Sequence, residues 1–525
     1  MCGIALIAGA GADEALLRQM LAALAPRGEV EETACEPGLL AGVQRLRIVD
    51  RERAVQPWRA GRWLLCYNGE IFNYRQLRAE LIGLGRELRT ESDTELVLEA
   101  FAEWGERAVT RFRGEFAFAI ADRETGRVYL GRDPVGVKPL YWSCRDGRLH
   151  VASEVKALVP SGGPVSEVPP GQHGWAEKGA APSLARYVDL SRLDRPAIEE
   201  PDEAAKALRR AVEDSIRVRV DTDLTVGVIL SGGLDSSIVL TQVAEMHPDC
   251  VALTIGAPGS DDLLYARRLC RELGVTHEVI TVRPGDLHAG DVREAIRLSE
   301  LTEYGDIINA VVSVPLFARA RQLGVKVVLT GDGSDELFGG YAMYSHSDGD
   351  ASRRLFQHMI ANLHRTELQR VDRVSMGNGV EARVPYLDPA LIELAMRIPV
   401  GLKIRAGQEK WIMRQAFADA LPDYILRRPK NPMSHSSGLH ERARMYRPLF
   451  AGMQRSFGYD LLAPVQRDFS VLLSRYNHDL ERAVAAAAAH QDYTAAEHAR
   501  DLAGALRWNA AAALRARRHP AAAPR

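Results

Sequence analysis

The spacing of hydrophobic and polar positions divides the chain into two parts. Up to about residue 158, short apolar runs alternate with glycine-containing turns, which predicts strands, two of them in a hairpin around residues 123–126. From about residue 200 onwards, apolar runs of strand length alternate with longer amphipathic segments. This alternation predicts a parallel sheet with helices on both faces. The segments concerned are Glu199–Arg217, Val226–Leu230, Val251–Ile255, Asp261–Leu273, His277–Val282, Val312–Leu323 and Lys326–Leu329.

The strongest local signal lies where the expected strand Val226–Leu230 meets the next helix. Ser231-Gly232-Gly233 requires a tight backbone turn, and Asp235-Ser236-Ser237 offers side chains that can cap a helix beginning at Ile238. Backbone N–H groups and the positive end of a helix dipole then face one point, which favours an anion. No lysine follows the glycines, so this is not a Gly-Lys-Ser/Thr nucleotide loop; a plain glycine turn before a helix is the alternative.

Length and composition narrow the functional classes. A chain of 525 residues is too long for one hydrophobic core, so several domains are expected. The net charge of -2 gives no bulk attraction to nucleic acid or lipid, and no apolar run reaches the ~18 residues of a spanning helix. Six cysteines without a Cys-x-x-Cys pair argue against a disulfide scaffold or a zinc ribbon and fit a reducing compartment. We therefore expect a cytoplasmic protein without a signal peptide that binds neither nucleic acid nor membrane.

The N-terminus carries a second candidate site. Cys2 follows the initiator methionine directly, and removal of Met1, which is expected before a small residue, would leave a cysteine with a free α-amine. Such an amine has a pKa near ~7.7–8.0 and can act as the base for its own thiol. Further along, Asn68-Gly69 is by itself a strong turn signal, and Ser92–Glu95 is by itself a helix-capping box.

Taken together, the segments from residue 2 to residue 158 resemble, in the same order, the glutaminase domain of class II glutamine amidotransferases. The resemblance implies Cys2 as the nucleophile and Arg45 as the residue that holds the glutamine α-carboxylate, because a planar guanidinium matches a carboxylate. It also implies Asn68 and the Gly69 N–H as the oxyanion hole. The other glutamine-binding positions that it implies are Ile48, Val49, Glu70 and Asp93.

The second half carries two further resemblances. The Ser231–Ser236 stretch resembles the pyrophosphate-holding Ser-Gly-Gly-x-Asp-Ser loop of the N-type ATP pyrophosphatases. The motifs after it, through about residue 430, resemble the synthetase domain of glutamine-hydrolysing asparagine synthetases: Gly331–Tyr341, Val371–Met376, Gly379–Asp388 and Lys410–Arg414.

These resemblances imply a two-domain ligase. Residues 1–190 would form an α+β Ntn-hydrolase-like sandwich of two antiparallel sheets between helices. Residues 200–525 would form an α/β parallel-sheet ATP-pyrophosphatase domain with a helical C-terminal cap, which includes the alanine-rich stretch 481–518. We also expect a homodimer.

The implied cofactors are ATP and Mg²⁺, and the implied substrates are glutamine and a small carboxylic acid. Asp235 and Asp335 would hold Mg²⁺, and Lys410 would stabilise charge on the α-phosphate. Asp332 would orient or deprotonate the incoming ammonia, with support from Glu381 and Arg383. The remaining ATP-binding positions are Leu230, Ser231, Gly232, Gly233, Ser236, Ile255, Thr330 and Gly331. Ammonia released at the cysteine would travel through a closed passage, because it is nucleophilic only when neutral.

Two departures from the family patterns concern the substrates. Where relatives have Arg-Gly-Pro-Asp, this chain has Arg27-Gly28-Glu29-Val30, so closure of the glutamine pocket is expected to differ. Where some asparagine synthetases have Thr-Thr-x-Arg facing the aspartate, this chain has Ile308-Asn309-Ala310-Val311. The second departure suggests an acceptor acid that is bulkier or less charged than aspartate.

Four functions therefore stay open. The first is glutamine-dependent, AMP-forming amidation of aspartate, which is the default, and the second is the same chemistry on another acid in specialised metabolism. The third is an adenylating cyclase with an unused glutaminase domain, which the intact Cys2 argues against. The fourth is a regulatory nucleotide-binding module without catalysis, which the acids Asp235, Asp332 and Asp335 with Lys410 argue against.

Overall fold

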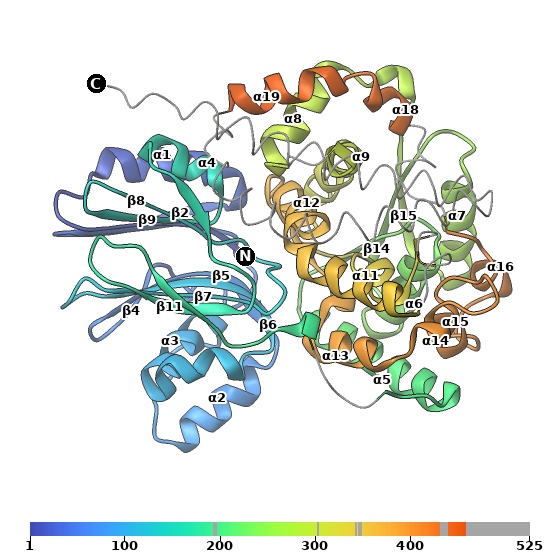
Figure 1. The fold of residues 1–525 in the computed structure, drawn as a ribbon, viewed down its shortest axis with the longest axis horizontal. Helices are drawn as coiled ribbons and strands as arrows, with labels where there is room; N and C mark the ends of the chain where they lie inside the picture. Colours follow the sequence, from blue (N-terminus) through green and yellow to red (C-terminus); the bar gives the residue numbers. More distant parts are fainter. Residues whose placement is uncertain (193–196, 302–303, 342–343, 345–348, 431–438, 458–525) are drawn as a thin grey trace. The chain divides into compact units, whose positions relative to one another are not determined.

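A computed structural model describes residues 1–192, 197–301, 304–341, 344, 349–430 and 439–457, and the chain within them divides into two compact units (Figure 1). The first unit comprises Met1–Asp189 and Ser375–Glu381, with a short piece from residue 455. The second comprises Leu190–Val374 and Ala382–Gln454. The alanine-rich stretch 481–518, predicted to be helical, lies outside the described residues. No helix in the described ranges is long and apolar enough to cross a membrane.

The first unit is built on two six-stranded sheets in which all neighbouring strands are antiparallel, as the sequence predicts. The first sheet has the order β10-β8-β9-β1-β3-β2, with β1 (Cys2–Ala8), β2 (Val30–Glu36), β3 (Leu39–Arg45), β8 (Tyr141–Arg145), β9 (Arg148–Ala152) and β10 (Val165–Glu167). The second has the order β12-β11-β7-β6-β5-β4, with β4 (Trp58–Ala60), β5 (Trp63–Ile71), β6 (Gly114–Asp122), β7 (Val128–Arg132), β11 (Gln172–Ala176) and β12 (Ser183–Arg186).

Helices cover the outer face of each sheet. Figure 1 shows α1 (Glu14–Leu24) and α4 (Val155–Leu158) on one side, and α2 (Tyr74–Gly83) and α3 (Asp93–Trp104) on the other. This layering explains the two-residue alternation along β5. Its Leu64 and Cys66 belong to the core between the sheets, whereas Leu65 and Tyr67 belong to the core beneath α2 and α3.

Two local expectations in this unit were wrong. Asn68-Gly69 forms no turn, because β5 continues through both residues and pairs them with Ala117 and Phe116 of β6. Gly69 is required by space instead, since a Cβ there would lie 2.4 Å from the Glu115 carbonyl oxygen. The capping box at α3 is half formed: the Ser92 hydroxyl accepts from the Glu95 N–H, but the Glu95 carboxylate accepts from backbone N–H groups at residues 89 and 90.

The second unit contains a five-stranded sheet in the order β15-β14-β13-β16-β17. The pairs β13–β14, β13–β16 and β14–β15 are parallel, as predicted. The strands are β13 (Val226–Ile229), β14 (Val251–Gly256), β15 (Thr276–Thr281), β16 (Val327–Leu329) and β17 (Glu381–Arg383). Because β14 and β16 lie on opposite sides of β13, the chain changes direction there, and the carboxyl ends of these strands form the edge where open α/β sheets bind ligands.

Seven helices of the second unit are used in the description of the site. They are α5 (Pro201–Arg219), α6 (Leu234–Met246), α7 (Asp261–Leu273), α9 (Tyr304–Gln322), α10 (Ser334–Phe338), α12 (Glu367–Met376) and α15 (Trp411–Ala416). Helix α5 buries Ala204, Leu208, Val212 and Ile216, the stripe that the sequence pattern identifies. Helix α6 starts earlier than predicted: Gly233 is its N-cap, so Asp235, Ser236 and Ser237 lie inside its first turns.

Candidate active sites

The first site surrounds Cys2, the first residue of β1. Its main-chain N–H donates to Asn68 Oδ1 at 3.0 Å, and Gln56 Nε2 lies 3.5 Å from its Sγ. Burial raises the pKa of the Cys2 thiol, although the neighbouring α-amine opposes this. The thiol therefore rests protonated and needs a base before it can act as a nucleophile.

The α-amine that lies closest to this thiol belongs to Met1, which still precedes Cys2 in the structure. Burial alone would lower the pKa of this amine, but the Glu381 carboxylate, 3.1 Å away within the same unit, raises it above its ordinary value. Arg383 donates to the Arg219 carbonyl at 2.6 Å. The expected support of the ammonia site at Asp332 by Glu381 and Arg383 stays a prediction.

Asn68 is oriented by the bond to Cys2. Because its Oδ1 accepts that N–H, the amide nitrogen Nδ2 points elsewhere; it is fully buried and has no hydrogen-bond partner among the described residues. A buried N–H group without a partner costs about 1–3 kcal/mol, so such groups are kept where a ligand completes them. Gly69, the next residue, lines the cavity that contains Cys2, whereas Asn68 is not among the residues that line it.

The other predicted glutamine-binding residues line the same cavity as Cys2. They are Arg45, Ile48, Val49, Gly69, Glu70 and Asp93. Asp93 accepts from the Tyr67 hydroxyl at 2.6 Å and from the Ile71 N–H at 3.1 Å, and burial raises its pKa. The structure thus gathers residues separated by up to 91 sequence positions, from Cys2 to Asp93, around one thiol.

The guanidinium of Arg45 is already engaged. Its Nε and a terminal nitrogen donate to the two carboxylate oxygens of Glu32 at 2.9 and 3.0 Å, and its other terminal nitrogen donates to the Arg51 carbonyl at 3.0 Å. The sequence alone does not identify Glu32, because its partner becomes visible only once β2 and β3 are paired.

The second site is the turn between β13 and α6. Gly232 adopts φ 68°, and a Cβ on it would lie 2.7 Å from the Tyr265 Cβ, so glycine is required for two reasons. The Ser231 hydroxyl accepts from the Gly233 N–H at 3.3 Å, and the Ser236 hydroxyl accepts from the Ser231 N–H at 3.2 Å. These bonds hold the turn at the start of α6, where the helix dipole favours an anion.

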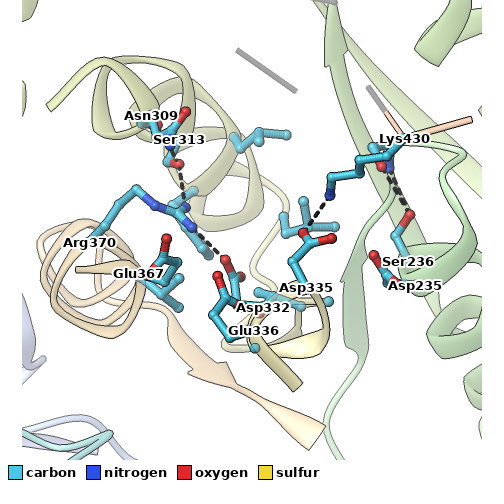
Figure 2. Close-up of a pocket in the computed structure, with 18 of the residues that line it drawn as sticks. Asp235, Ser236, Asn309, Ser313, Asp332, Asp335, Glu336, Glu367, Arg370 and Lys430 are labelled. Atoms are coloured by element: carbon cyan, nitrogen blue, oxygen red, sulfur yellow. Dashed lines mark hydrogen bonds and ion pairs between the residues drawn. The ribbon is translucent and has the colours of Figure 1, made fainter. Parts of the chain in front are cut away.

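Two acids and two lysines meet beside this turn. Lys410 contacts Asp235 and lies 2.5 Å from Asp335, and Lys430 also lies 2.5 Å from Asp335. Burial would raise the pKa of Asp335, but the two ammonium groups hold it well below its ordinary value. Figure 2 shows Lys430 reaching Asp335 above Asp235 and Ser236. Lys430 was not among the predicted site residues, since its position past the last motif gave no signal.

The predicted metal ligands fit a phosphate-bound Mg²⁺. Asp235 and Asp335 are ionisable acids at one edge of the sheet, and each is now balanced by a lysine cation. Mg²⁺ typically binds proteins through one or two carboxylates and completes its shell with water and substrate phosphates, so two acids suffice. Among the described residues, no group of three or more His, Cys, Asp or Glu side chains could hold a metal by itself.

Asp235, Asp335 and Lys430 line a cavity of about 190 Å³. This cavity of the second unit continues towards α9 and α12. Figure 2 shows Arg370 of α12 pointing at Asp332 and at Ser313 of α9, which it contacts at 2.5 and 3.1 Å. Arg370 directly precedes the predicted motif Val371–Met376. It was not predicted, because the family pattern places the cation that faces the acceptor at the position of residues 308–311. Of those, Asn309 lines the cavity.

Two further carboxyl groups, those of Glu336 and Glu367, also line this cavity. Glu336 accepts from the Tyr341 hydroxyl, and Glu367 lies one helical turn before Arg370. Burial and the charge of Glu367 raise the pKa of Glu336, and burial raises that of Glu367. Thr330 and Gly331 also line the cavity, whereas Leu230 and Ile255 are buried in the sheet at 1% exposure and do not.

A buried cysteine at the start of a two-sheet sandwich, joined in one chain to a Ser-Gly-Gly-Leu-Asp-Ser turn on a parallel sheet, defines the class of two-site amidotransferases. Comparison with known proteins agrees. The glutamine amidotransferase domain family matches residues 1–171, and the asparagine synthase family matches residues 207–352 and 345–456.

The chain is 34% identical over 424 residues to asparagine synthetase B [glutamine-hydrolyzing] of Escherichia coli (strain K12), an alignment that covers 75% of this chain and 74% of that protein. It is 32% identical over 478 residues to the asparagine synthetase [glutamine-hydrolyzing] of Asparagus officinalis, which covers 83% of this chain and 78% of the relative. The chain belongs to the family of glutamine-hydrolysing asparagine synthetases, a family of ligases of the amidotransferase type.

Proposed function

We propose that this protein hydrolyses glutamine at Cys2, adenylates a carboxylic acid with ATP in its second unit, and joins the released ammonia to that acid as an amide. The observation that carries the proposal is the cluster of Asp235, Asp335, Lys410 and Lys430 beside the turn at Ser231. A regulatory module has no need of paired acids and lysines at a phosphate-binding turn, whereas a reaction that expels pyrophosphate needs both signs of charge.

In the glutaminase half, loss of Met1 would leave the Cys2 α-amine beside its own thiol. The amine takes the thiol proton, and the sulfur attacks the glutamine amide carbon. The oxygen of that carbon gains negative charge, and in this proposal the Asn68 Nδ2 and Gly69 N–H groups stabilise it. The amine then returns the proton to the departing nitrogen, ammonia leaves, and water releases glutamate from the thioester.

In the synthetase half, the carboxylate of the acceptor attacks the α-phosphorus of ATP, and pyrophosphate departs towards the turn at Ser231. Asp235 and Asp335 would hold Mg²⁺, which neutralises charge on the leaving pyrophosphate. Lys410 stabilises charge on the α-phosphate. Ammonia next attacks the acyl carbon and expels AMP, and Asp332 accepts the proton that ammonia loses.

The acceptor has two candidates. Aspartate is the default, and Arg370 could receive its α-carboxylate. A less charged or bulkier acid is the second candidate. Two features favour it: Arg370 is already paired with Asp332, and Leu316, Phe317 and Val371 give the cavity apolar lining.

A panel of carboxylic acids with glutamine and ATP·Mg²⁺, read by mass spectrometry, tests the proposal. An amide product with equimolar AMP is expected for at least one acid, and efficient use of aspartate would remove the second candidate. Hydrolysis of ATP to ADP, or AMP formation without any amide, would contradict the proposal.

A further inference from the structure

We propose that Glu32 is a built-in competitor of glutamine, which occupies the carboxylate-binding guanidinium of Arg45 until the substrate displaces it. The inference rests on the proposed glutaminase reaction and on the role that the family resemblance implies for Arg45, which is to hold the α-carboxylate of glutamine. It adds a residue, Glu32, that sets the apparent affinity of this chain for glutamine.

The contact between the two side chains has the geometry of a bound carboxylate. Nε and one terminal nitrogen of Arg45 donate to different oxygens of Glu32, at 2.9 and 3.0 Å. Such two-bond pairing of guanidinium and carboxylate is the strongest arrangement available to either group. Both side chains are largely buried, at 8% and 19% exposure, so water screens the pair only in part. The third nitrogen of Arg45 is used by the Arg51 carbonyl. Glu32 therefore stands in for a substrate carboxylate.

The fold explains why Glu32 reaches this position. Strands β2 and β3 pair so that Glu32 lies opposite Val43, two residues from Arg45, which makes the two side chains diagonal neighbours on one face. Long side chains meet readily at that spacing. The strand that carries Glu32 begins at Val30, inside the segment where this chain lacks the Pro-Asp of its relatives.

Glu32 is also linked to the nucleophile. Its carboxylate accepts from the Gln56 main-chain N–H at 2.8 Å, and the side chain of the same glutamine reaches Cys2 Sγ at 3.5 Å. Strand β2 lies at the edge of its sheet and pairs with β3 alone, so it can shift more easily than a central strand. Displacement of Glu32 is therefore feasible, and it would release the main-chain N–H of Gln56, the residue whose side chain reaches the thiol.

The consequence is a lower apparent affinity for glutamine. A site that is free for only a fraction of the time binds its ligand more weakly by that fraction. If Glu32 leaves Arg45 free about one-tenth of the time, the Kd for glutamine is about tenfold higher than the guanidinium alone would give. The contact restrains glutamine hydrolysis at low glutamine concentration and leaves the use of free ammonia unaffected.

The test is direct binding of glutamine to a Cys2→Ala background, which cannot turn glutamine over, measured by calorimetry. Adding Glu32→Gln or Glu32→Ala should tighten glutamine binding about tenfold. The matched control is Glu36→Gln on the same strand, whose carboxylate pairs with Arg123 at 2.9 Å instead of with Arg45. It should leave the Kd unchanged. Unchanged or weaker glutamine binding in both Glu32 variants would overturn the inference, because it would make Glu32 a group that positions Arg45.

A second ligand separates competition from a general change in the pocket. 4-Aminobutanamide keeps the amide and the amine of glutamine but lacks the α-carboxylate, so its binding should not respond to Glu32→Gln. Equal tightening for both ligands would contradict direct competition. The proposed function fails separately: it fails if the unmodified enzyme releases no glutamate, or if Arg45→Lys leaves the KM for glutamine unchanged. An Arg45-dependent KM that does not fall in Glu32→Gln rejects the inference alone.

Discussion

Replacement of Asn68 by alanine tests the glutaminase chemistry at the atom that the structure singles out. Its Nδ2 is buried without a partner in the described part of the chain, while Oδ1 is fixed by the Cys2 N–H at 3.0 Å. A donor held ready in this way acts on the charge that develops on the amide oxygen and contributes little to binding of the neutral amide.

The expected loss follows from that role. Removal of one oxyanion donor typically lowers kcat about 10²–10³-fold, or about 2.7–4 kcal/mol of transition-state stabilisation. We expect this loss in kcat for glutamate release from Asn68→Ala, with the KM for glutamine changed less than about threefold. The fold should tolerate the change, because the variant loses one buried hydrogen bond and at the same time removes a buried donor without a partner, two effects of opposite sign.

The assay measures glutamate release at saturating glutamine and, separately, AMP formation with ammonium as the nitrogen source. Asn73→Ala is the matched control, since the Asn73 side chain bonds to two backbone groups, the Arg111 carbonyl and the Arg113 N–H, at 3.0 Å each. A fall in kcat of less than threefold for Asn68→Ala would refute the oxyanion role. Equal loss of the ammonium-supported reaction would instead make Asn68 a structural residue.

Three further predictions follow from other parts of the molecule. A lysine inserted between Met1 and Cys2 should prevent removal of the methionine and abolish glutaminase activity, while synthesis supported by ammonium persists. The intact mass of the protein reports the state of the N-terminus. Retained glutaminase activity would show that no free Cys2 amine is needed. Asp335→Asn should lower AMP formation about 10²-fold or more, because one of the two proposed Mg²⁺ ligands is lost, and should spare glutamate release. Parallel loss of both activities would argue against separate sites. Burial lowers the pKa of Lys403 to about 7 from 10.5, so between these pH values the unfolded chain binds the extra proton and stability rises with pH. Lys403→Met should therefore raise Tm most below pH 7 and flatten its dependence on pH, and an unchanged slope in calorimetry would contradict this.

Much of the fold could be predicted because the local hydrophobic pattern of the sequence agrees with the strand pairing in the structure. The runs that became β13, β14 and β16 are almost entirely apolar, as strands buried on both faces must be, and the nearby helices α5 and α7 each show one apolar stripe. The two-sheet sandwich was predicted from resemblance more than from periodicity, because strands buried on both sides, such as β6, show no polar face.

Other features depend on contacts that a sequence does not display. The turn propensity of Asn68-Gly69 lost to pairing with β6, where a continuous ladder satisfies more backbone groups than a two-residue turn. Arg370 and Lys430 are distant in the sequence from the residues that they contact in the cavity, which are Asp332 and Asp335 respectively. Glu32 needed the register of β2 on β3. In each case the deciding term is a long-range contact, and local propensity carries no information about it.

The most direct measurement of the central claim follows the nitrogen atom. With glutamine labelled with ¹⁵N at its side-chain amide, ATP·Mg²⁺ and an acid accepted by the enzyme, mass spectrometry should find ¹⁵N in the product amide, with one AMP and one glutamate for each amide formed. An amide without the label, or AMP formation in which glutamate release has no part, would contradict the account.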